Sequence, residues 1–167
     1  LLSRGLGDVY KRQIIDSARK LSKRLDLEIY IVGGYVRDLF TQTTKESDLD
    51  FMVVGDGIKF AQEFKDSLGG SKLVSFSKFG TARFMINNKT IEVASSRIED
   101  YKLNSRNPKI DKTDLSTDIL RRDFTINTLA VSVNDHDFGN LFDLFTLKRF
   151  IQLNAKTINT YLTLFFY

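Results

Sequence analysis

The sequence predicts an α+β fold, a small mixed β-sheet with helices on one side. Short apolar runs over 28–32 and 49–54, bounded by glycines and polar residues, have the length of buried strands. Apolar residues at helical spacing follow in 60–68, and this alternation of segment types favours helices packed on a sheet. The Asn87-Asn88 pair lies between two apolar segments and predicts a β-hairpin turn.

Local patterns predict the other elements in the same way. A polar segment over 100–114 contains the only proline and is predicted to be a mobile loop. Apolar residues over 126–133 predict a segment that starts helical and then becomes extended. In chain order, we expect a helix at 14–25, a strand at 28–32, a helix at 35–40, a strand at 49–54, a helix at 60–68, and strands at 72–76, 82–86 and 90–94.

The composition limits the kinds of site that the chain can build. A length of 167 residues fits one domain with a real core. Without cysteine, and with His136 as the only histidine, the chain cannot form a thiolate or His-rich zinc site. Any metal must therefore be held by carboxylates, which suits Mg²⁺. The net charge of +4 is compatible with a nucleotide or nucleic-acid partner but does not require one.

Hydropathy indicates the expected location of the chain, and the composition of its two ends indicates the expected domain limits. No apolar run approaches the ~20 residues that span a bilayer, and no signal peptide is visible, so we expect a cytoplasmic location. Residues 1–13 lack clear periodicity, and we expect them to be adaptor-derived. We expect the domain itself at 14–145, and a truncated or frame-shifted tail at 146–167.

Two glycines after the first predicted strand form the first candidate ligand site. Gly33 and Gly34 let the backbone approach a ligand closely, and the amides of the helix that follows favour phosphate. Arg37 then has two interpretations. It either forms an ordinary pair with Asp38 that fixes the start of the helix, or it reaches a triphosphate.

Two aspartates at the second predicted strand form a candidate metal site. Asp48 and Asp50 are two residues apart and point to the same face, where two like charges favour a bound cation. For an Asp-x-Asp pair taken alone, a strand edge exposed to solvent is the alternative interpretation. The glycine turn that precedes this pair favours the metal site. Glu92 alternates with Ile91 and Val93, so it either faces the same site or faces solvent.

A basic and acidic group near the end of the predicted domain is the third candidate. Arg122 is able to bind phosphate bidentately, and Asp123 is able to accept a hydrogen bond from a ribose hydroxyl. Taken alone, an R-R-D sequence is more often a charge cluster at the end of a helix. For Arg97, a surface ion pair is likewise commoner than phosphate binding.

Three motifs in this order and spacing carry a family resemblance. They are G-G-Y-V-R-D at 33–38, D-L-D at 48–50 and R-R-D-F-T-I-N-T-L-A at 121–130. Over 28–145 the chain resembles the head domain of class II tRNA nucleotidyltransferases and bacterial poly(A) polymerases, in the DNA polymerase β-type nucleotidyltransferase superfamily. Thr128 departs from the usual Ala of the third motif.

The resemblance implies a role for each matching residue. The segment 100–114 matches a loop that takes part in the reaction in these enzymes. By position, the implied roles are catalysis and metal binding for Asp48 and Asp50, metal binding for Glu92, and nucleotide binding for Gly33, Gly34, Arg37, Asp38, Arg122 and Asp123.

The resemblance also implies an activity, the Mg²⁺-dependent addition of CMP or AMP from CTP or ATP to the 3′ end of tRNA. Poly(A)-type adenylation of RNA 3′ ends and a nucleotide- or RNA-binding fragment without turnover are the alternatives. The family's helical neck, which carries the base-selecting E-D-x-x-R element, and its helical body are not found after 145. The stretch 142–148 lacks the Pro and Gly that usually follow in the family.

Overall fold

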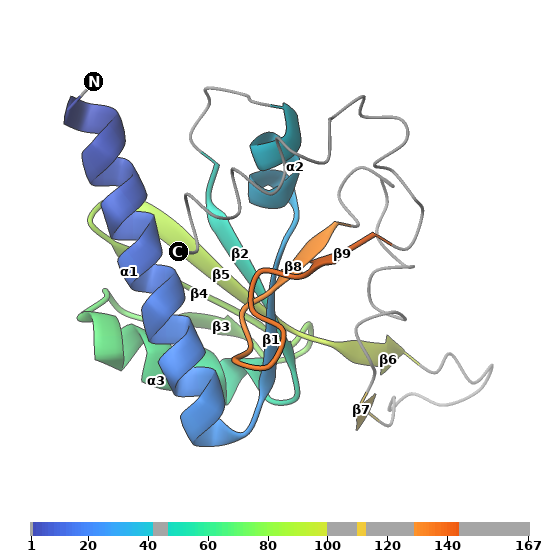
Figure 1. Ribbon diagram of the computed structural model, residues 1–167. Coiled ribbons are helices and arrows are strands. Elements are labelled where there is room, and N and C mark those ends of the chain that lie inside the picture. Colours follow the sequence, from blue (N-terminus) through green and yellow to red (C-terminus); the bar gives the residue numbers. More distant parts are fainter. Residues whose placement is uncertain (1, 42–46, 100–109, 113–128, 144–167) are drawn as a thin grey trace.

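A mixed sheet of seven strands organises the molecule (Figure 1). The computed structural model describes residues 2–41, 47–99, 110–112 and 129–143. The strands of the sheet follow the order β3-β4-β5-β2-β1-β8-β9. The elements are α1 (Leu2–Leu25), β1 (Glu28–Val32), α2 (Gly34–Thr41), β2 (Leu49–Val54), α3 (Gly57–Leu68), β3 (Val74–Phe76), β4 (Thr81–Ile86), β5 (Lys89–Ser95), β6 (Arg97–Glu99), β7 (Ile110–Lys112), β8 (Ala130–Ser132) and β9 (Leu141–Phe142).

The strand pairing confirms the predicted mixed sheet. β2 pairs with β5 in parallel, and the other pairings within this sheet are antiparallel. The predicted hairpin is present, because Asn87 and Asn88 adopt φ angles of +48° and +62° between β4 and β5. Asn tolerates this left-handed region better than most residues, so the pair closes the turn.

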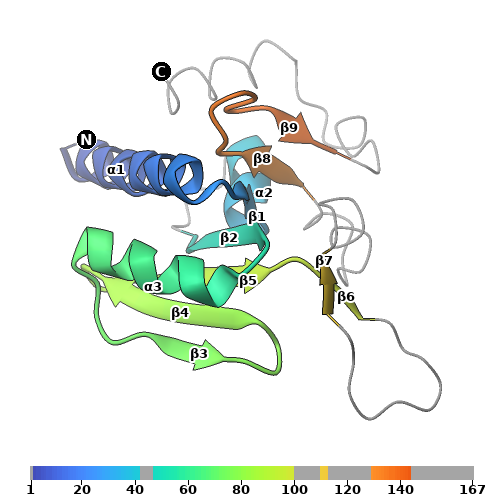
Figure 2. The same cartoon turned by 90° about the horizontal axis from the view of Figure 1, so that it is seen from below.

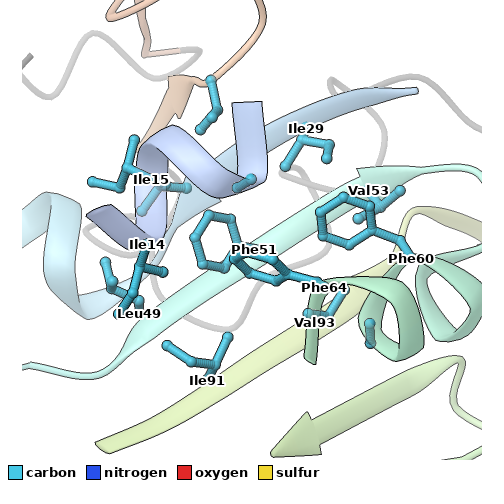
Figure 3. Packing of buried hydrophobic residues seen from close by; sticks show 14 of the residues in the cluster. Ile14, Ile15, Ile29, Leu49, Phe51, Val53, Phe60, Phe64, Ile91 and Val93 are labelled. Atoms are coloured by element: carbon cyan, nitrogen blue, oxygen red, sulfur yellow. The ribbon is translucent and has the colours of Figure 1, made fainter. Parts of the chain in front are cut away.

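The main core lies between one face of the sheet and helices α1 and α3 (Figure 1 and Figure 2). Phe60 and Phe64 of α3 lie next to Phe51 of β2 (Figure 3). The Phe64 ring makes edge-on contacts with Phe51 at 5.3 Å and with Phe84 of β4 at 5.8 Å between centroids. This confirms that the helices cover one side. The opposite face of the central strands carries a second, smaller buried cluster of Tyr30, Val32, Met52 and Ala130.

Local signals place α3 where the sequence predicts a helix. The Asp56 carboxylate accepts a hydrogen bond of 2.9 Å from the backbone N–H of Lys59, which caps the first turn. Gly69 ends the helix in the left-handed conformation with φ +67°. The helix therefore starts three residues before the predicted position, because its cap lies in the Gly-Asp-Gly turn after β2.

The structure also differs from the predictions at the first helix and within the predicted loop. The helix expected from residue 14 begins at Leu2, so 2–13 continue α1, and their adaptor origin stays a prediction. Residues 110–112 lie within the predicted loop but form β7, which pairs with β6 in an antiparallel register. Even a polar segment can pair in this way, since the ladder is formed by backbone hydrogen bonds that every non-proline residue can make. The rest of that predicted loop, 100–109 and 113–114, lies outside the described residues, and so does the predicted tail at 146–167.

No helix in the described part of the chain is both long enough and apolar enough to cross a bilayer.

Candidate functional site

The glycine turn lies directly against Asp50. Gly33 follows β1 with φ +76°, a conformation that residues with a Cβ rarely adopt. A Cβ at this position would lie 3.0 Å from Oδ2 of Asp50. The two are brought together by the sheet, because Val32 of β1 pairs with Asp50 of β2. The turn and the aspartate, 17 positions apart in the sequence, therefore form one site.

The neighbouring strand adds Glu92 to the same row. Asp50 and Glu92 are partners in the parallel pairing of β2 with β5, on strands about 4.8 Å apart. Ile91 and Val93 are buried in the main core, so Glu92 projects from the opposite face and is exposed. The predicted alternation at Glu92 is thus confirmed, whereas its role as a metal ligand stays a prediction.

Asp48 lies just before β2 and is exposed, two residues from the half-buried Asp50. Within the described ranges, no group of three or more His, Cys, Asp or Glu residues is arranged to hold a metal ion together. The carboxylates of Asp50 and Glu92 are nevertheless hard oxygen donors on neighbouring strands, and the absence of a side chain at Gly33 leaves space beside Asp50. The donor chemistry fits a divalent cation such as Mg²⁺.

Arg37 and Asp38 form an ion pair in α2. Nε of Arg37 donates to Oδ1 of Asp38 at 2.8 Å, and the Asp38 side chain is only 9% exposed. This hydrogen bond raises the pKa of Arg37 above its ordinary value, and partial burial acts in the opposite direction. The pair proposed from the sequence is confirmed, and contact between Arg37 and a triphosphate stays a prediction.

Ser47 is a member of this cluster that the sequence pattern did not indicate. Its hydroxyl donates to Oδ2 of Asp38, while the backbone N–H of Arg37 donates to the carbonyl of Gly33 at 3.2 Å. Asp38 thereby connects the start of α2 to the residue before the Asp48 and Asp50 pair. Its partner lies nine positions away across a connection, so no local periodicity could have indicated it.

The third predicted group, Arg122 and Asp123, lies outside the described residues. The structure places Arg97 at the start of β6, directly after the sheet strand β5. The described part of the site therefore consists of the glycine turn, the Arg37–Asp38 pair and the row that contains Asp50 and Glu92.

Known proteins are similar to this chain in sequence and in fold. Residues 29–158 match the family described as poly A polymerase head domain. The chain is 41% identical over 140 residues to the A-adding tRNA nucleotidyltransferase of Geobacter sulfurreducens, covering 83% of this chain and 16% of that protein. It is 42% identical over 120 residues to the enzyme of the same name from Aquifex aeolicus, covering 71% and 14%.

Solved structures of a tRNA nucleotidyltransferase and of a CCA-adding enzyme are also similar to this chain. A tRNA nucleotidyltransferase complexed with a primer tRNA and an incoming ATP analog matches with a TM-score of 0.68 and 37% identity, over 81% of this chain and 36% of that chain. A CCA-adding enzyme with CTP matches with a TM-score of 0.70 and 32% identity, over 87% and 34%.

The chain thus spans 14–16% of the two curated relatives and about a third of the solved chains. The match over most of this chain confirms the resemblance seen in its motifs. The chain belongs to the poly(A) polymerase head domain family, and its fold is the head domain of the class II tRNA nucleotidyltransferases.

Proposed function

We propose that this chain is the catalytic head of an enzyme that transfers a nucleotide from ATP or CTP to the 3′ end of a tRNA. The observation that supports this most directly is that Gly33 leaves room for only a residue without a Cβ beside the Asp50 carboxylate, with Glu92 next in the row. It combines a close backbone turn for phosphate with carboxylates for a cation, which phosphoryl transfer requires.

The proposed roles follow from these positions. Gly33, Gly34 and Arg37 hold the triphosphate, while Asp38 and Ser47 hold Arg37 and the start of α2 in place. Asp48, Asp50 and Glu92 hold Mg²⁺, which when bound stabilises negative charge on the reacting phosphate oxygens. Arg122 and Asp123 contact the ribose, as the motif implies.

Relatives favour ATP as a donor, because the proteins 41% and 42% identical to this chain are both named A-adding tRNA nucleotidyltransferases. Proteins named CCA-adding enzymes match at 27–35% identity, so CTP is the second donor to test. Poly(A)-type adenylation of another RNA 3′ end is the alternative within the family. A cytoplasmic location stays a prediction.

The test is incorporation of labelled ATP or CTP into a tRNA that lacks its 3′-terminal nucleotides, in the presence of Mg²⁺. We expect Asp50→Asn to lower the rate at least about 100-fold, since losing a cation ligand removes several kcal/mol of charge stabilisation. The matched control is Asp66→Asn, an exposed carboxylate on α3 with the same change in charge. Unchanged turnover in Asp50→Asn refutes the assignment.

A binding fragment without turnover is the second candidate, because the chain covers about a third of the solved enzymes. Equilibrium binding of labelled ATP in the same samples separates the two. Incorporation supports the enzyme, whereas Mg²⁺-dependent ATP binding without incorporation supports the binding fragment.

A further inference from the structure

Strands β3 and β4 form one edge of the sheet (Figure 2). Large apolar side chains of these strands and of the turn between them are exposed. We call this surface the β3–β4 strip and define it by Val74, Phe76, Lys78, Phe79, Arg83 and Met85. Its four apolar side chains are 42–62% exposed, and among the described residues Val9 is the only other large apolar side chain that is exposed. Such a concentration of exposed apolar side chains marks an interaction surface.

Strand register places the strand residues of this strip, Val74, Phe76, Arg83 and Met85, on the same face as the candidate site, and Phe79 lies in the turn that joins the two strands. Val74 of β3 is opposite Arg83 of β4, Arg83 is opposite Glu92 of β5, and Glu92 is beside Asp50 of β2. Residues opposite each other on paired strands share a face. Arg83 is thus two strands from Asp50, about 10 Å along the row.

The charge of this segment indicates the chemistry of a partner. From residue 69 to residue 91 the sequence has no Asp or Glu, and its basic residues are Lys72, Lys78, Arg83 and Lys89. A surface of this kind attracts polyanions. Along the row of paired residues, the acidic Asp50 and Glu92 are therefore followed by the basic Arg83 of the strip.

The aromatic side chains of the strip lie beside its cations. The guanidinium carbon of Arg83 lies 5.7 Å from the ring centroid of Phe76, and Nζ of Lys78 lies 5.9 Å from that of Phe79. Exposed aromatic rings together with cations are the combination that binds single-stranded nucleic acid, because bases stack on the rings and phosphates pair with the cations.

We propose that the β3–β4 strip binds the single-stranded RNA that leads to the reacting 3′ end. Bases stack on Phe76 and Phe79, and Arg83 and Lys78 pair with the phosphates. The inference rests on the proposed function and specifies where its RNA substrate lies. A second copy of the chain fits the strip less well, since two strips would bring like charges together.

RNA affinity measured without nucleotide or turnover tests the strip. The probe is a fluorescein-labelled tRNA without its 3′-terminal adenosine, followed by anisotropy over a range of salt concentrations. We expect Phe76→Ala to raise Kd at least about fivefold through lost stacking. Arg83→Gln is expected to raise Kd and to lower the slope of log K against log salt by about 0.7 to 0.9.

Two exposed residues of α1 provide matched controls. Lys20→Gln removes one positive charge, as Arg83→Gln does, and Val9→Ala removes exposed apolar surface, as Phe76→Ala does. Both controls should bind the tRNA as the wild type does. Unchanged affinity in Phe76→Ala and Arg83→Gln overturns the inference, and so does a wild-type chain that binds no RNA.

Two further measurements keep the test independent of variant folding and of catalysis. With 4-thiouridine-labelled tRNA and the wild-type chain, photo-crosslinks within 74–85 support the strip, and crosslinks found only elsewhere overturn it. If light scattering detects a dimer of the wild type that is lost in Phe76→Ala, the strip is a self-association surface. That result likewise overturns the inference. Strip-dependent RNA binding without nucleotide incorporation refutes the proposed function and leaves the strip intact.

Discussion

Gly33→Ala tests the contact between the glycine turn and Asp50. The substitution adds one carbon atom at a residue with φ +76°. That carbon would lie 3.0 Å from Oδ2 of Asp50, closer than ordinary van der Waals contact. The change therefore strains the backbone and displaces the carboxylate at the same time, and the two effects have separate readouts.

The backbone strain affects stability. A residue with a Cβ in the left-handed region costs about 1–2 kcal/mol. For a chain of this size, each kcal/mol lowers Tm by about 2–4 °C, so we expect a Tm about 2–8 °C lower. The displacement of Asp50 affects activity. A misplacement of about 1 Å costs about 100-fold in rate, and a shift of a few tenths of an ångström is expected to cost about tenfold.

Gly139→Ala is the control for the strain alone. Gly139 has φ +79°, nearly the same as Gly33, and a Cβ there meets no atom within 4 Å. Thermal unfolding should show similar losses of stability for the two variants. Single-turnover incorporation of ATP into tRNA should fall about tenfold for Gly33→Ala and stay at the wild-type rate for Gly139→Ala.

Equal rates in the two variants would refute the reasoning, because they would show that the carboxylate does not depend on the space left by Gly33. A normal Tm for Gly33→Ala would contradict the strained backbone instead.

Two further predictions concern stability. Phe64→Ala is expected to destabilise the fold by about 3–5 kcal/mol in urea denaturation, because the ring is fully buried against Phe51 and Phe84, and a loss below about 1 kcal/mol contradicts this packing. Ion pairs with Lys23 and Arg19 lower the pKa of Asp135 from 3.8 to about 2, so its stabilisation is present above pH 3.8 and is lost as the pH falls toward 2. Asp135→Asn should therefore be less stable than the wild type at pH 5, and this difference should shrink as the pH falls from 3.8 through about 2. A difference of the same size at pH 5 and pH 2 refutes the assignment.

The sequence predicted those elements whose signals lie within one short stretch of the chain. The bounds of β1 and β2 agree with the sequence prediction, because each is an apolar run bounded by glycines or charged residues. The first half of α1 was missed, since Gly5 and Gly7 interrupt its periodicity. Tyr10 of this half packs against the main core, so tertiary contact extends the helix beyond the local pattern.

The neighbours of a strand depend on contacts between distant segments, and this is why Glu92 could not be assigned from the sequence. Alternation predicted its face, but only the parallel pairing of β2 with β5 places it beside Asp50. A shift of one residue in β5 would turn Ile91 and Val93 out of the core and bury Glu92 against the helices. The same apolar contacts that stabilise the sheet therefore hold Glu92 in the row with Asp50.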